Sequence, residues 1–123
     1  ITSLWLLFSI MANSFVNKKA DLTSNSATTL YTVPSFSTAV IKSILVSEDS
    51  GNADTITVTL TDTSDNVFSL FKTKSISANA TTELLSAPLI AQESEVIKVT
   101  AATANRLHVI LSALEIKPRD VTS

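Results

Sequence analysis

The chain has 123 residues, a length that can enclose the hydrophobic core of one domain. Hydrophobic residues make up 45% of it and charged residues only 16%, and the absence of cysteine excludes disulfides, thiolate metal sites and cysteine nucleophiles. The net charge is -2 and the nine Lys and Arg are scattered, so we expect no nucleic-acid binding.

The chain opens with an apolar run at residues 1–10, ITSLWLLFSI. This run has about half the length that a membrane-spanning helix needs, and no basic residue precedes it, so we expect no membrane association. A signal-peptide remnant, translated upstream sequence and a packing segment are the alternative interpretations. We predict that residues 1–10 are an extension outside the domain, that the functional protein starts at Met11, and that 11–123 form a single β-sandwich domain.

From residue 15 onward, segments rich in β-branched residues alternate with turns of Ser, Asn, Asp, Gly and Pro, and no stretch has a helical period. In DTITVTLTD, residues 54–62, Ile56, Val58 and Leu60 alternate with threonines and should face the core. About eight strands are predicted, at 16–23, 28–33, 38–47, 54–62, 66–76, 81–86, 95–101 and 107–116. Two packed sheets would bury their apolar faces, so we predict an all-β fold, an antiparallel β-sandwich that can take jelly-roll form.

The turn residues support these boundaries. Gly51, the only glycine, stands beside Asn52 in a segment that suits a hairpin turn with positive φ. Pro34 and Pro88 each follow one predicted strand and precede another, where a missing N–H does least damage. Both prolines therefore mark strand ends.

Two predicted strands carry apolar residues on both faces. In strand 38–47, alternation places Val40, Ile44 and Val46 toward the core. The apolar residues on the opposite, outward faces are Ile110, Leu114 and Ile116 in strand 107–116, and Ile41 and Leu45 in strand 38–47. Either a loop or the N-terminal segment covers these faces, or they form a subunit interface, and we take the five residues as candidate interface residues.

Chemistry-bearing residues are sparse. The only histidine, His108, has no second His or Cys to complete a metal site or triad, so we expect it to face solvent or an interface. The turn acids form two groups, Glu48, Asp49 and Asp54 in one turn and Asp62 and Asp65 in the next. One strand separates the groups by roughly 25 Å, too far for a glycosidase pair. We predict solvated acids, no metal site, no cofactor and no enzymatic activity.

The segment from Met11 to Ile116 resembles a family of small virion structural proteins of tailed bacteriophages. The resemblance is carried by MANSFVNKKADLTSNSATTLYTVPSFSTAVIKSILVSE, DTITVTLTD, SISANATTELLSAPLIAQESEVIKVTAA and NRLHVILSALEI. It covers nearly the whole chain after Met11, and it consists of strand and turn signatures rather than catalytic motifs. It implies a non-enzymatic component of the virion that decorates the capsid or is associated with the tail or neck.

The leading hypothesis is therefore a virion protein that forms a homo-oligomer and binds other capsid or tail proteins through apolar strand faces and a neutral Ser/Thr surface. The alternative is a secreted β-sandwich module that binds glycans or the cell surface, with ITSLWLLFSI as the remainder of a signal peptide. Aromatic residues make up only 6% of the chain, and a sugar-stacking face would need more Trp and Tyr.

Overall fold

The computed structural model describes residues 11–118, and the predicted extension at residues 1–10 lies outside this range. The described chain contains no helix, and none therefore that could span a membrane. The strands are β1 (Met11–Asp21), β2 (Thr28–Thr32), β3 (Thr38–Glu48), β4 (Asp54–Thr61), β5 (Val67–Ile76), β6 (Thr81–Glu83), β7 (Leu89–Ala91), β8 (Val96–Ala101) and β9 (Leu107–Pro118).

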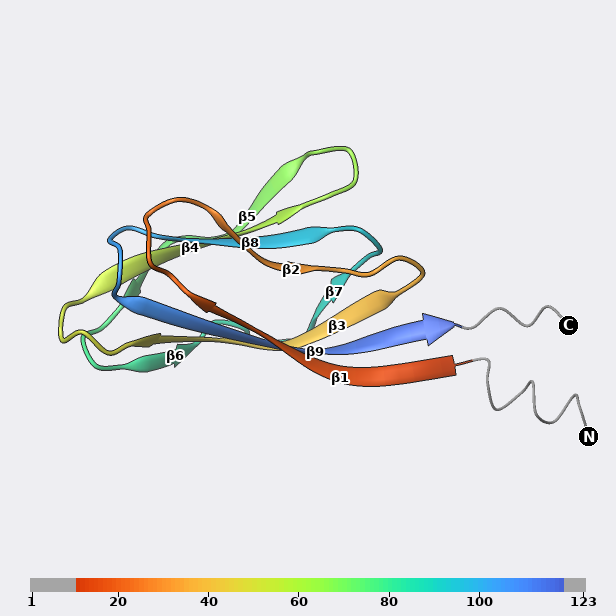
Figure 1. Ribbon diagram of the computed structural model, residues 1–123, viewed down its shortest axis with the longest axis horizontal. Coiled ribbons are helices and arrows are strands. Elements are labelled where there is room, and N and C mark those ends of the chain that lie inside the picture. Colours follow the sequence, from red (N-terminus) through yellow and green to blue (C-terminus); the bar gives the residue numbers. More distant parts are fainter. Residues whose placement is uncertain (1–10, 119–123) are drawn as a thin grey trace, which may run out of the picture.

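The strands form two antiparallel sheets that pack face to face (Figure 1). Sheet A has the order β1-β9-β3-β6, with β7 also paired to β3, and sheet B has the order β2-β8-β4-β5. Because β6 and β7 both pair with β3, one after the other along its length, they together take the place of one edge strand. With that replacement the strand order is that of a jelly roll, so the predicted β-sandwich is confirmed.

The core lies between the sheets and follows the alternation read from the sequence. In β4 every second residue is buried, and Ile56 and Val58 have no exposed surface. In β9 the residues from Leu107 to Ala113 alternate in the same way, with Val109 and Leu111 fully buried. Burial of each such side chain stabilises the fold by about 1.5–3 kcal/mol, so the apolar core between the sheets is the main source of stability.

The alternation predicted for β3 was wrong in its first half. The pairing of β3 with β9 shifts between Ile41 and Ser43, and this β-bulge inserts Lys42 as an extra residue. Both Ile41 and Ile44 therefore point into the core with no exposed surface, whereas Val40 is partly exposed. Ile41 cannot be an interface residue, because the bulge turns it inward.

The turns behave as expected, but one strand was not predicted. Gly51 has a φ of 82°, as its hairpin turn requires, and Pro34 and Pro88 lie outside the strands at their boundaries. The strand expected at 81–86 ends at Glu83, and β7 pairs with β3 through only three residues. Three residues carry too short a pattern for alternation to be recognised.

Candidate interaction surface

A row of apolar side chains crosses the outer face of sheet A. Phe15 of β1 pairs with Leu114 of β9, Leu114 pairs with Val40 of β3, and Val40 pairs with Ile90 of β7. Directly opposed residues in an antiparallel sheet point to the same face, so these four side chains form a continuous row, which we call the apolar row. Its ends are open to solvent, because Phe15 is 79% exposed and Ile90 is 51% exposed.

A second row runs parallel to the first and is apolar only at its centre. Ile110 of β9 pairs with Leu45 of β3, and both side chains are more than one third exposed. Lys19 flanks Ile110 on β1, and Glu83 flanks Leu45 on β6. This second row therefore combines an apolar centre with charged ends, a composition found in many association surfaces.

The structure places four of the five candidate interface residues on this face. Four of them are partly exposed on the outer side of sheet A, and only Ile41 is not: Leu114, Ile116, Ile110 and Leu45. Within the described chain no loop is paired over them; whether a partner covers them stays a prediction.

Three residues of the apolar row were not predicted to face outward: Val40, which was assigned to the core, and Phe15 and Ile90. Phe15 precedes the strand start that was predicted, since β1 begins at Met11 rather than at residue 16. Ile90 belongs to the short β7 strand. The period-two pattern that places Phe15, Asn17 and Lys19 on one face could have revealed Phe15. No local pattern marks Ile90.

His108 lies at the end of the outer face, between two carboxylates. Its Nε2 is 3.2 Å from Asp21 Oδ1 on β1, and its Nδ1 is 3.5 Å from Asp49 Oδ2 in the loop after β3. The ring is nearly half exposed, as expected for a surface histidine. The carboxylates lie on opposite sides of the ring, and no group of three metal-ligating side chains occurs within residues 11–118.

Glu48 and Asp54 correct the prediction of solvated turn acids. Glu48 is almost completely buried and accepts hydrogen bonds from the Ser50 hydroxyl and from the N–H groups of Ser50, Gly51 and Asn79. Burial opposes ionisation of this carboxyl, but these bonds more than offset it and lower its pKa to about 2. The Glu48 carboxylate therefore joins the β3–β4 turn to the β5–β6 turn, which local sequence did not reveal.

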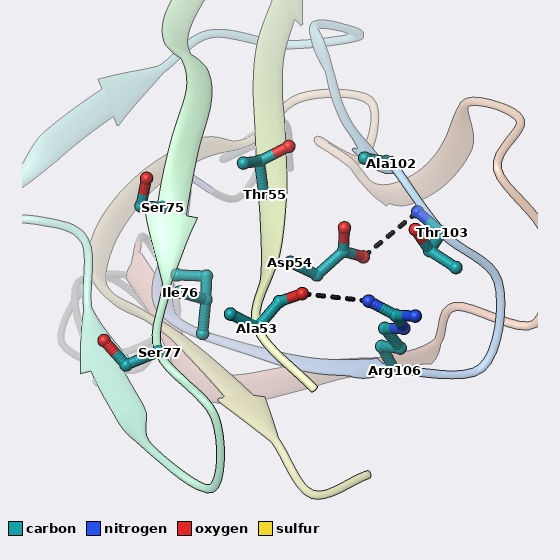
Figure 2. Close-up of a pocket in the computed structure, with 9 residues that line it drawn as sticks. All are labelled: Ala53, Asp54, Thr55, Ser75, Ile76, Ser77, Ala102, Thr103 and Arg106. Atoms are coloured by element: carbon teal, nitrogen blue, oxygen red, sulfur yellow. Dashed lines mark hydrogen bonds between the residues drawn. The ribbon is translucent and has the colours of Figure 1, made fainter. Parts of the chain in front are cut away.

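Asp54 lies in a polar hollow at one end of the sandwich, with a volume of about 330 Å³ (Figure 2). Asp54 Oδ2 accepts a bond of 3.1 Å from the Thr103 N–H, and the Arg106 guanidinium donates one of 2.9 Å to the Ala53 carbonyl. These bonds attach the β8–β9 loop to the start of β4. The charged groups of the hollow thus have a structural role.

A third buried acid links the two sheets. Tyr31 of β2 donates a hydrogen bond of 2.6 Å to Glu115 Oε2 of β9, and Lys117 Nζ lies 3.5 Å from Glu115 Oε1. Burial of the phenol, together with the adjacent carboxylate, raises the pKa of Tyr31 far above its usual value. The Glu115 carboxylate is therefore buried, hydrogen-bonded to Tyr31 and paired with the partly exposed Lys117, and it is shielded from any substrate.

Comparisons with known proteins return little. No protein-family model matches the chain, and no curated protein matches its sequence. One similar solved structure is the cryo-EM structure of a virus-like particle of the extra small virus of the giant freshwater prawn Macrobrachium rosenbergii. It is 15% identical, covers 89% of this chain and 81% of that chain, and has a TM-score of 0.45.

Proposed function

We propose that the protein is a non-enzymatic structural component of a bacteriophage virion. It decorates the capsid or belongs to the tail or neck, and it acts by associating with itself and with other virion proteins. The resemblance of residues 11–116 to small phage virion proteins supports this role. Jelly rolls occur in viral capsid proteins and also in lectins and cupins, so the fold is compatible with the proposal without selecting it.

The observation that carries the proposal is the apolar row. Phe15 and Ile90 are each more than half exposed, and Leu114 and Val40 connect them into one strip across four strands. A continuous exposed apolar strip is typical of an association surface, because its burial removes apolar area from water. Asn17, Ser112 and Ser43 form a neutral polar row beside it, which adds hydrogen-bonding groups without a strong charge.

The three buried acids also favour a structural role. Glu48 and Asp54 are bound to backbone N–H groups, and Glu115 is bound to Tyr31. A general acid or base has to reach its substrate, and these carboxylates are engaged by the fold instead. The proposal of a protein without enzymatic activity rests on this engagement.

The glycan-binding alternative has less support. A sugar-stacking platform needs aromatic rings on one surface. The exposed aromatic residues of the described chain are Phe15 on β1, Phe36 between β2 and β3, and Phe68 on β5. They lie on three separate elements.

Particle incorporation tests the proposal. We expect the double substitution Ile90→Ser and Ile110→Ser to reduce the copies per purified particle at least about tenfold, measured by quantitative mass spectrometry, since losing ~1.4 kcal/mol of apolar contact suffices. Neither residue belongs to β1, and both are at least 40% exposed, so folding should be preserved.

The matched control is the pair Val67→Ser and Phe68→Ser. These residues are also apolar and are even more exposed, but they lie on β5 in the other sheet. We expect this variant to be incorporated normally. Normal incorporation of the Ile90 and Ile110 variant would show that the outer face of sheet A is not the attachment surface.

A further inference from the structure

The sheet edges differ in how well they are protected against pairing with another strand. At the edges of the sandwich, β6 and β7 have three residues each, β2 has five with a register shift, and β5 shifts register twice against β4. Short or bulged edge strands resist further pairing. Three edges of the described fold are thus closed to a partner strand.

The edge formed by β1 lacks these protections. β1 has eleven residues and pairs with β9 without any register shift, and its other side has no partner strand within residues 11–118 (Figure 1). It contains no proline, and its side chains from Asn13 to Lys19 are almost all exposed. A long, regular, uncovered edge presents a row of backbone donors and acceptors that a strand can pair with.

We propose that two copies of this protein pair through their β1 strands, antiparallel about a twofold axis at Asn17, so that sheet A continues from one copy into the next. The inference rests on the self-association named in the proposed function and places it at the edge of sheet A, whereas attachment of the outer face to other virion proteins is tested separately. An isologous contact of this kind closes on itself and stops at a dimer.

The charges of β1 are compatible with pairing to a second copy and favour one register. With the axis at Asn17, residues whose numbers add up to 34 lie opposite each other: Lys19 faces Phe15, Lys18 faces Val16, and Asp21 faces Asn13 of the second copy. Every charge therefore faces a neutral residue, and Lys19 lies over an aromatic ring, a favourable contact for a cation.

Neighbouring registers are less favourable. Moving the axis to residue 18 or 19 sets Lys18 or Lys19 against itself, and like charges directly opposite are destabilising. An axis at Val16 separates the charges but leaves the exposed Phe15 ring against the Asn17 amide. With the axis at Asn17, the two amides can bond to each other, whereas the lysines disfavour the registers centred on residues 18 and 19.

Cysteine substitution tests the axis directly, because the protein has no cysteine of its own. Across a twofold at Asn17, the two Asn17 Cα atoms would be about 4.5–5.5 Å apart, within disulfide reach, and the two Lys19 Cα atoms about 14 Å apart. We expect Asn17→Cys to oxidise rapidly to a covalent dimer on non-reducing gels. The control Lys19→Cys, on the same exposed face, should not.

Light scattering of the unsubstituted protein across a concentration series should show a monomer–dimer equilibrium. Asn17→Lys and Asn17→Glu should each be monomeric alone, through like-charge repulsion at the axis, and should form a dimer when mixed, which excludes misfolding as the cause. The proposal would be overturned if the unsubstituted protein stayed monomeric, or if both cysteine variants cross-linked equally. Neither result depends on particle incorporation.

Discussion

At the scale of single residues, Glu48 shows how one buried carboxylate organises two turns. Its oxygens accept hydrogen bonds from Ser50 and Gly51 in its own turn and from Asn79 in the β5–β6 turn. These bonds favour the ionised form and lower the pKa from an ordinary 4.5 to about 2. Proton binding to this group is therefore linked to unfolding.

The substitution Glu48→Gln tests this link. Because the folded-state pKa is lowered, the stabilisation by Glu48 is complete above about pH 4.5 and is lost as the pH falls from 4.5 to 2. We expect Glu48→Gln to be less stable at neutral pH and to lose stability less steeply over that window. Urea unfolding at a series of pH values measures both, and an unchanged slope would contradict the assignment.

At the scale of elements, the bulge in β3 depends on a side chain of its neighbour β6. β6 and β7 pair with β3 on either side of residues 42–44 and leave a gap in the ladder. The Glu83 carboxylate fills it, with Oε2 accepting a bond of 2.8 Å from the Ile44 N–H and Oε1 one from the Ser43 hydroxyl. Burial opposes ionisation of Glu83, but these bonds lower its pKa overall.

We expect Glu83→Ala to destabilise the protein by about 1 kcal/mol, since Glu83 is exposed and solvent replaces part of the lost bonding. The Ile44 amide should also exchange faster with solvent, which hydrogen exchange detects. Glu83→Gln is the control, because it keeps an acceptor and should lie between the two. Equal protection of the Ile44 amide in all three proteins would refute this role.

At the scale of the whole molecule, the two sheets are joined by apolar packing and by one buried polar contact. Tyr31 from sheet B reaches Glu115 in sheet A, and both side chains are at least 94% buried. A hydrogen bond to a buried charge contributes more than one between neutral groups. This contact therefore ties the β2 edge to β9.

Tyr31→Phe should lower the free energy of unfolding by about 2 kcal/mol, because it keeps the ring but leaves Glu115 Oε2 without its donor. Combining it with Glu115→Gln should cost less than the sum of the two single substitutions, since the uncompensated charge is gone. Denaturant unfolding of the four proteins provides the double-mutant cycle. Strict additivity would show that the two side chains do not interact.

The sequence by itself determined the fold class, the approximate positions of eight of the nine strands in residues 11–118, and the inward faces of β4 and β9, because period-two alternation and turn chemistry are local properties. It also identified Ile110, Leu114, Ile116 and Leu45 as outward apolar residues. The early start of β1 was missed, and residues 1–10 remain a prediction.

Only the tertiary structure decided which side Ile41 faces, that Glu48 is buried, and that Phe15 and Ile90 end one apolar row. A bulge, a buried acid and a row across four strands each depend on segments far apart in the chain. A neighbouring strand decides whether an extra residue such as Lys42 is accommodated. Alternation along one strand carries no information about that neighbour.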